Sequence, residues 1–156
     1  MSENKDDPAR LAEVIEAAEV TVAVAESLTA GKLCSALGAA PNSGEWFRGG
    51  VVAYATEVKR KVLNMPDVPP VCSEAAAALA TGVRSLLEAD LAVATTGVGG
   101  PGPQDGEPAG SVWFGVATDK GVDTIHRQFS GEPEEVLDQT VAFALRLLFE
   151  AAELRV

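Results

Sequence analysis

The residues of this sequence that are best placed for chemistry are a serine and a lysine. Ser27 follows an apolar run that begins at Thr21, and small and hydroxylated residues surround it. A serine hydroxyl in such a turn can attack a carbonyl carbon while nearby backbone amides hold the oxyanion that forms. Lys59 is followed by Arg60 and Lys61, and cationic neighbours near a helix N-terminus disfavour a charged ammonium. An uncharged Lys59 would serve as the general base toward Ser27.

Each of these residues also has a purely structural interpretation. Ser27 or Thr29 is able to cap a helix, because serine and threonine are favoured at helix N-termini. The run from Lys59 to Lys61 is typical of a cationic surface in contact with water. Taken one residue at a time, these structural interpretations are favoured over catalysis.

A glycine-rich segment after another apolar run is a further candidate for ligand binding. The segment has the G-x-G-x-x-G motif of a dinucleotide-binding turn, formed by Gly97, Gly99 and Gly102, but such a turn must open a helix. Pro101 and Pro103 forbid a regular helix there. The glycines still allow a ligand to approach the backbone closely, and their N–H groups could hold a phosphate or an oxyanion. The alternative is a long turn that binds nothing.

Strands and helices alternate along the chain in an order that would bring these residues together. Apolar periodicity and turn residues predict helices over 8–19, 29–39, 56–63, 73–89 and 133–154, and strands over 21–25, 50–55, 91–96, 111–118 and 122–129. This order predicts one α/β domain over residues 1–156, a three-layer α/β/α sandwich with a mixed, mostly parallel sheet, and residues 1–7 as a flexible tail.

The carboxyl ends of parallel strands meet at one edge of such a sheet, where open α/β proteins bind their ligands. Ser27, Gly97 and the segment from Tyr54 to Lys59 each follow a predicted strand, so we expect them at this edge. A Ser-Lys pair is therefore the nucleophilic arrangement that the sequence favours. A Ser-His-Asp triad has little support, because His126 is the one histidine and lies in the second strand of a predicted hairpin.

Composition excludes several classes of function. The formal net charge of −11 disfavours direct binding to nucleic acids or anionic membranes. No apolar stretch has the length of a membrane helix, and the polar N-terminus is unlike a secretory signal, so we expect a cytoplasmic protein. Cys34 and Cys72 lack metal-ligand spacing, so we expect neither a metal site nor a disulfide.

Four blocks of the sequence resemble the CinA C-terminal domain family, whose members include bacterial nicotinamide-nucleotide amidohydrolases. The blocks are 25–31, 54–59, 96–101 and 110–114, in the right order, and the likeness extends from about Leu11 to Leu148. The resemblance implies a three-layer α/β/α fold, often as a homodimer, without a metal or an organic cofactor. The implied reaction is deamidation of a small-molecule nucleotide substrate, nicotinamide mononucleotide, to nicotinate mononucleotide and ammonia.

The resemblance also assigns roles by position. Ser27 would be the nucleophile, Lys59 its base, and Tyr54 the residue that orients the lysine or shuttles a proton. The residues that would contact substrate are Glu26, Thr29, Thr96, Gly97, Gly99 and Gly100.

The chain departs from the family pattern around these positions. Leu28, Ala30 and Thr56 stand where members usually carry Cys, Gly and Asn. Pro133 and Leu137 stand where members tend to carry arginines, which hold phosphates well. Two alternatives therefore stay open, namely a non-catalytic nucleotide-binding or regulatory module and an amidase for another substrate.

Overall fold

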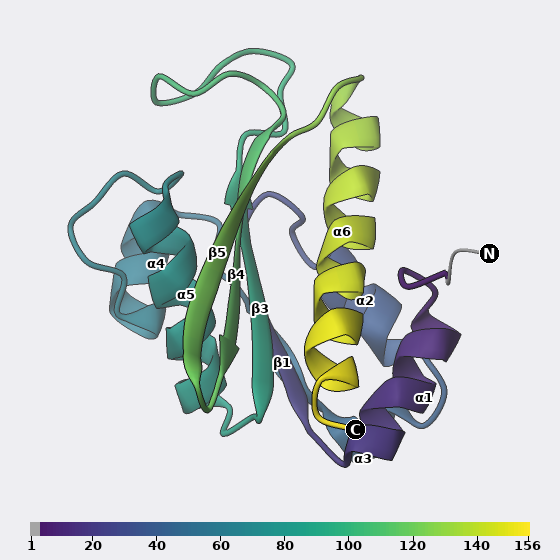
Figure 1. Ribbon diagram of the computed structural model, residues 1–156. Coiled ribbons are helices and arrows are strands. Elements are labelled where there is room, and N and C mark those ends of the chain that lie inside the picture. The colour runs from purple at the N-terminus through teal and green to yellow at the C-terminus, as the bar shows by residue number, and fades with distance from the viewer. Residues whose placement is uncertain (1–3) are drawn as a thin grey trace.

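A five-stranded mixed sheet runs through the molecule in the computed structural model, which describes residues 4–156 (Figure 1). The strands are β1 (Val22–Glu26), β2 (Phe47–Val52), β3 (Leu91–Gly97), β4 (Ser111–Thr118) and β5 (Gly121–Gln128), in the spatial order β2-β1-β3-β4-β5. β1 is parallel to β2 and β3, whereas β4 is antiparallel to both β3 and β5. The mixed sheet is confirmed. Parallel pairing is confined to one half of it, so "mostly parallel" was too strong.

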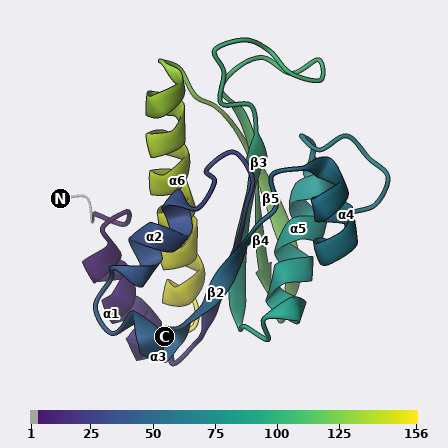
Figure 2. The ribbon, with the colours of Figure 1, turned by 180° about the vertical axis from the view of Figure 1, so that it is seen from behind.

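Helices cover both faces of the sheet and complete the three layers (Figures 1 and 2). The elements on one side are α4 (Thr56–Leu63) and α5 (Ser73–Leu86), and those on the other are α1 (Pro8–Ala18), α2 (Lys32–Gly38) and α6 (Pro133–Glu153). A short helix, α3 (Ser43–Trp46), leads into β2. The α/β sandwich expected from the sequence is therefore confirmed.

The central strands are buried because helices pack against both of their faces. Every residue of β1 is buried, as is β3 from Leu91 to Thr96. Phe114 and Leu148 belong to the apolar core on the α6 side, and Leu79 belongs to the core on the α5 side. This double burial explains why β1 and β3 are nearly continuous apolar runs in the sequence.

The second strand differs from its prediction. β2 begins at Phe47 and ends at Val52, whereas the sequence predicted 50–55. Gly49 and Gly50 obscured the strand because glycine has low β-propensity. Gly50 is required there, since a Cβ would overlap Val24 and the Cys34 sulfur. Trp46, directly before β2, is buried in the core with its indole N–H donating to the Pro41 carbonyl at 3.2 Å.

The predicted N-terminal tail is partly ordered. Residues 1–3 lie outside the described residues. Asp7 caps α1, and its carboxylate accepts a hydrogen bond from the Ala9 N–H at 3.0 Å. The Lys5 amine lies 3.8 Å from the Glu150 carboxylate. Between residues 4 and 156, no helix has the length and apolar character needed to cross a bilayer.

Candidate active site

The turn after β1 places Ser27 at the carboxyl edge of the sheet. Ala30 and Gly31 adopt left-handed backbone conformations, with φ of 47° and 105°, and α2 begins only at Lys32. A right-handed helix cannot continue through such residues. The predicted helix start at Thr29 is therefore wrong, and the segment from Ser27 to Gly31 is an irregular turn.

Glu26 holds this turn against α2. Its carboxylate is 1% exposed and accepts hydrogen bonds from the backbone N–H groups of Leu33 at 2.9 Å and Cys34 at 2.8 Å. The first N–H groups of a helix have no partner within the helix, and negative charge is favourable beside them. The helix is thus capped by Glu26, and the interpretation of Ser27 or Thr29 as its cap is wrong.

Lys59 is the buried cation of the site. Its side chain is 4% exposed, and its Nζ donates to the backbone carbonyl of Tyr54 at 3.4 Å. Burial lowers the pKa of the Lys59 ammonium, and the nearby Asp105 carboxylate partly opposes that shift. The sequence predicted the lowered pKa of Lys59 but attributed it to neighbouring cations. The structure assigns it mainly to loss of water around the amine.

A cavity of about 310 Å³ joins these segments at the carboxyl edge of the sheet. The predicted site residues in its wall are Ser27, Tyr54, Lys59, Thr96, Gly97, Gly99 and Gly100. Tyr54 is 69% exposed, and the Thr96 hydroxyl donates to the Pro70 carbonyl. Within residues 4–156, no hydrogen bond joins the Ser27 hydroxyl to the Lys59 amine. Hydrogen bonds between catalytic groups are often long in ligand-free structures.

Two predicted substrate contacts do not reach the cavity wall. Glu26 is occupied by the cap of α2, and Thr29 is fully buried with its hydroxyl 3.2 Å from that of Thr95. Both side chains lie behind the turn that carries Ser27. Their positions suit support of the turn better than contact with a ligand.

The wall also contains residues that sequence reasoning missed. Pro70 and Val71 come from the connection between α4 and α5, and Gln104 comes from the loop between β3 and β4. Pro133 and Leu137, from the start of α6, line the cavity as well, at the two positions where the resemblance would have placed arginines. The proline-rich composition of the α4–α5 connection indicated a loop, but only the packing of α5 shows which sheet edge that loop reaches.

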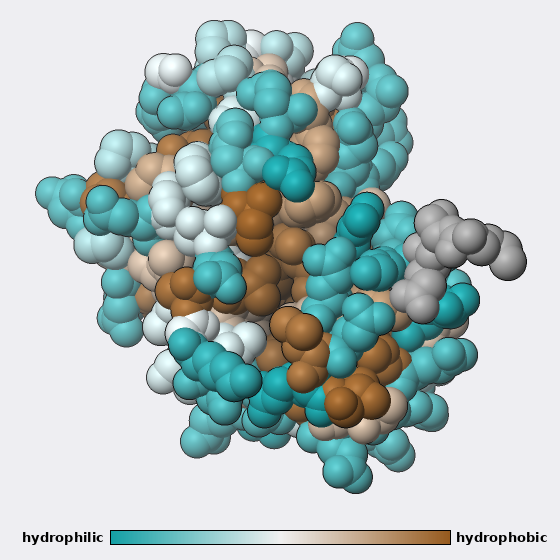
Figure 3. Space-filling model, in the orientation of Figure 1, coloured by the Kyte–Doolittle hydropathy of each residue, from teal (hydrophilic) through white to brown (hydrophobic). Residues whose placement is uncertain are grey.

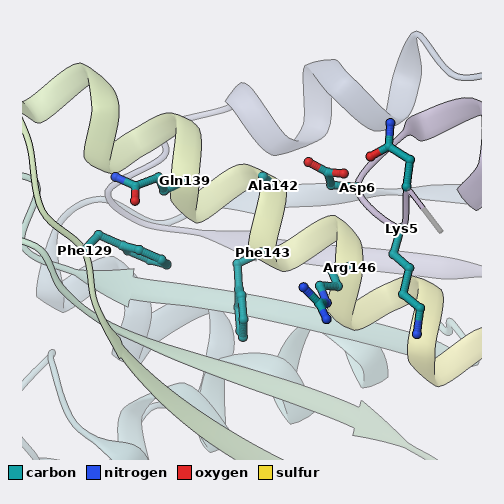
Figure 4. Close-up of a pocket in the computed structure, with 8 residues that line it drawn as sticks. Lys5, Asp6, Phe129, Gln139, Ala142, Phe143 and Arg146 are labelled. Atoms are coloured by element: carbon teal, nitrogen blue, oxygen red, sulfur yellow. The ribbon is translucent and has the colours of Figure 1, made fainter. Parts of the chain in front are cut away.

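Other hollows are larger, but their described walls hold no buried lysine. One of about 660 Å³ lies along α6, where Phe129, Gln139, Phe143 and Arg146 face it (Figure 4). Among the described residues of its wall there is no serine, cysteine or histidine. We therefore place the candidate site at the smaller cavity, because its wall holds both a hydroxyl and a buried amine.

A second serine meets the histidine away from this site. The Ser111 hydroxyl lies 2.9 Å from Nε2 of His126 and donates to the Glu107 carboxylate at 3.3 Å. Ser111 is 1% exposed, and its hydroxyl is already hydrogen-bonded to both His126 and Glu107. This pair lacks the access that a nucleophile needs, in agreement with the low support for a histidine-based triad.

Comparison with known proteins agrees with the fold. The sequence model of a family described as the CinA C-terminal domain matches residues 5–152. The chain belongs to the CinA C-terminal domain family. The CinA-like protein of Frankia casuarinae is 41% identical over 133 residues, which cover 82% of this CinA-family chain and 31% of that protein. Protein YdeJ of Escherichia coli (strain K12) is 36% identical over 146 residues, covering 90% of this chain and 85% of that protein.

Solved structures of the CinA superfamily share the whole fold. A competence-damaged protein (CinA) superfamily protein from Klebsiella pneumoniae 700603 superposes with a TM-score of 0.90 and 32% identity, covering 97% of this chain and 98% of that one. The chain spans about a third of the length of several curated relatives. The family membership and fold expected from the four blocks are therefore confirmed.

Proposed function

We propose that this CinA-family chain is a cytoplasmic amidohydrolase that uses Ser27 and Lys59 as a catalytic dyad. Its substrate would be a nicotinamide nucleotide such as nicotinamide mononucleotide, whose carboxamide is converted to a carboxylate with release of ammonia. The observation that carries this proposal is the presence of Ser27 and a buried Lys59 of lowered pKa in the wall of one cavity.

In the first half of the reaction, uncharged Lys59 accepts the Ser27 hydroxyl proton while Oγ bonds to the carboxamide carbon. The carbonyl oxygen becomes an oxyanion. Within residues 4–156, the amides of Gly99 and Gly100 donate to no other group, so they are candidates to hold it. The Lys59 ammonium then returns its proton to the nitrogen as the C–N bond breaks, which releases ammonia and leaves an ester on Ser27.

In the second half, water attacks that ester. Lys59 again accepts a proton, now from the water, and returns it to Oγ as the ester bond breaks. The products are the carboxylic acid, which ionises, and free Ser27. A base with a lowered pKa suits both halves, because it exchanges protons readily near neutral pH.

Glu26 and Thr29 would support this chemistry indirectly, by holding the turn that carries Ser27. By capping α2, Glu26 fixes the turn that carries Ser27. We assign both as positioning residues, since neither lies in the cavity wall. Thr96 would have a similar role, because its hydroxyl links the end of β3 to Pro70.

The test is release of ammonia from nicotinamide mononucleotide by the wild type and by Ser27→Ala. We expect turnover by the wild type and a loss of about 10³-fold or more in kcat for the variant. Lys59→Ala should cost about as much as Ser27→Ala, and the double variant little more, because the two residues act as a unit. Absence of ammonia with the wild type would rule out this substrate.

A non-catalytic binding module is the second candidate. The observation in its favour is that the Ser27 hydroxyl and the Lys59 amine share no hydrogen bond within residues 4–156. Calorimetry separates the two functions. A module would bind the nucleotide persistently with an unchanging heat signal, whereas a hydrolase would show continuing heat from turnover.

We also propose that the chain acts as a homodimer. The support is an exposed edge strand, β5, beside a groove whose mixed wall includes the apolar side chains of Ile125, Phe143 and Leu147 (Figure 3). Unpaired edges next to apolar surface favour association with another chain.

A further inference from the structure

The cavity wall holds very little positive charge. Among the residues that line it, Lys59 is the one charged side chain. If Lys59 is the general base of the proposed dyad, it must be uncharged when substrate arrives. A lysine in that state cannot also serve as the counter-charge of a bound phosphate.

The start of α6 cannot easily supply that counter-charge either. Its first turn lies beside the cavity, since Pro133 and Leu137 are in the wall. The Glu132 carboxylate accepts from the Glu135 N–H, and the Glu135 carboxylate accepts from the Glu132 N–H at 3.0 Å. Pro133 has no N–H to offer. The positive end of this helix is therefore already occupied by carboxylates of the chain itself.

Several residues that neighbour the wall residues in the chain are acidic. Exposed carboxylates adjoin wall residues in the chain at Glu57, Asp105, Glu134 and Asp138. Arg60, the basic neighbour of Lys59, is paired with Asp67 at 3.0 Å. Negative charges beside a cleft repel a dianionic group such as a phosphate and attract a cation.

We propose, building on the amidohydrolase function above, that this cavity selects carboxamides that carry no phosphate. The favoured ligand is an uncharged carboxamide or one on a cationic ring. The apolar side chains of Leu28, Val71 and Leu137 then meet the body of the ligand, while the exposed carboxylates that flank the wall residues in the chain attract its positive charge. The dephosphorylated nucleoside is thus a better ligand than the mononucleotide.

Nicotinamide mononucleotide and nicotinamide riboside test this directly, because they share the carboxamide and the pyridinium ring and differ only in the phosphate. We measure kcat/KM for ammonia release from each at low salt. We expect kcat/KM to be about tenfold higher for the riboside. This preference should shrink as added salt screens the carboxylates beside the wall. Equal values, or a preference for the mononucleotide, would overturn the inference.

A charge-gain variant tests the cause. Leu137→Arg adds a cation to the wall, and Leu137→Gln adds a polar side chain of no charge. A charge-assisted pair with phosphate should shift the preference toward the mononucleotide by on the order of tenfold in the arginine variant alone. The same shift in both variants, or in neither, would refute a preference set by charge.

Binding to the Ser27→Ala variant separates this inference from the catalytic proposal. Calorimetry with the two ligands reports selection without turnover, and we expect tighter binding of the riboside. If neither compound releases ammonia with the wild type, the hydrolase assignment fails while this binding order still tests the selectivity. If the mononucleotide is turned over and also binds more tightly, the selectivity fails and the dyad stands. Binding of neither ligand overturns the selectivity as well.

Discussion

Ser27 and Lys59 depend on the cavity in different ways. The hydroxyl needs access, and although Ser27 is only 6% exposed, it lies in the wall of the cavity. The amine needs burial, because loss of water lowers the pKa of Lys59 and so makes the uncharged base available. A single small cavity can satisfy both needs, because its wall shields the amine while its space admits a ligand.

The pH dependence of turnover should follow the lysine. Activity requires uncharged Lys59, so kcat/KM should rise with pH and level off below the ordinary lysine value of 10.5. Asp105 holds the pKa of Lys59 up, so Asp105→Asn should move the rising limb to lower pH. Glu13→Gln, at an exposed site on α1, is the control and should leave the profile in place. A shift to higher pH in Asp105→Asn would contradict this electrostatic account.

Burial of Lys59 should also cost stability. The folded pKa lies below the unfolded one, so between the two values the unfolded chain binds more protons. The free energy of unfolding should therefore rise with pH in that window, up to 10.5. Lys59→Met should remove this slope and stabilise the protein by about 1 kcal/mol at pH 7, with activity lost. Urea denaturation at several pH values measures both effects, and a destabilised variant would count against an uncompensated buried amine.

At the scale of elements, Glu26 couples β1 to α2. A glutamine of the same shape puts an NH2 donor in place of one carboxylate oxygen, so the N–H of either Leu33 or Cys34 loses its acceptor. Glu26→Gln should lower the free energy of unfolding by about 1–3 kcal/mol and also reduce kcat, because the turn carrying Ser27 loosens. Glu16→Gln, exposed on α1, is the matched control for denaturation and kinetics. Unchanged stability would show that the cap contributes nothing.

The glycine-rich loop offers a paired test of its two ends. A Cβ at Gly97 would lie 2.5 Å from the Ser111 carbonyl oxygen, whereas one at Gly99 would meet only the Leu137 side chain at 3.9 Å. Gly97→Ala should therefore destabilise the protein by about 1–3 kcal/mol. Gly99→Ala should keep the melting temperature and alter only ligand binding. Equal melting temperatures for the two variants would contradict the packing seen at the end of β3.

At the scale of the whole molecule, β5 offers a self-complementary edge. Asp123, Ile125 and Arg127 share one face of the strand, because alternate residues do. Antiparallel pairing of two β5 strands about Ile125 would place Asp123 opposite the partner's Arg127. The two Ile125 side chains would then make an apolar contact at the centre. Light scattering should therefore report a homodimer. Asp123→Arg should weaken it by about tenfold, and Asp119→Arg, beyond β5, should do so less. A monomer at high micromolar concentration would exclude this arrangement.

Much of the fold was predictable from local pattern. β1 and β3 are apolar runs because helices cover both of their faces, and α6 shows its caps and periodicity over its whole length. The start of α2 was misplaced because Ala30 adopts a left-handed conformation, which cannot be predicted from an alanine side chain. β2 was misplaced because glycine has low strand propensity, whereas the structure requires Gly50 through its contact with β1 and α2.

Sequence by itself determined the candidate nucleophile, its base, the glycine-rich loop and the edge of the sheet at which they meet. Residue type and strand order are enough for that, since parallel strands end together. Only the tertiary structure decided which side chains face the cavity. Glu26 caps α2 and Thr29 contacts Thr95, whereas Leu137 lies in the cavity wall. It also decided why the pKa of Lys59 is lowered, because desolvation depends on atoms brought close from distant parts of the chain.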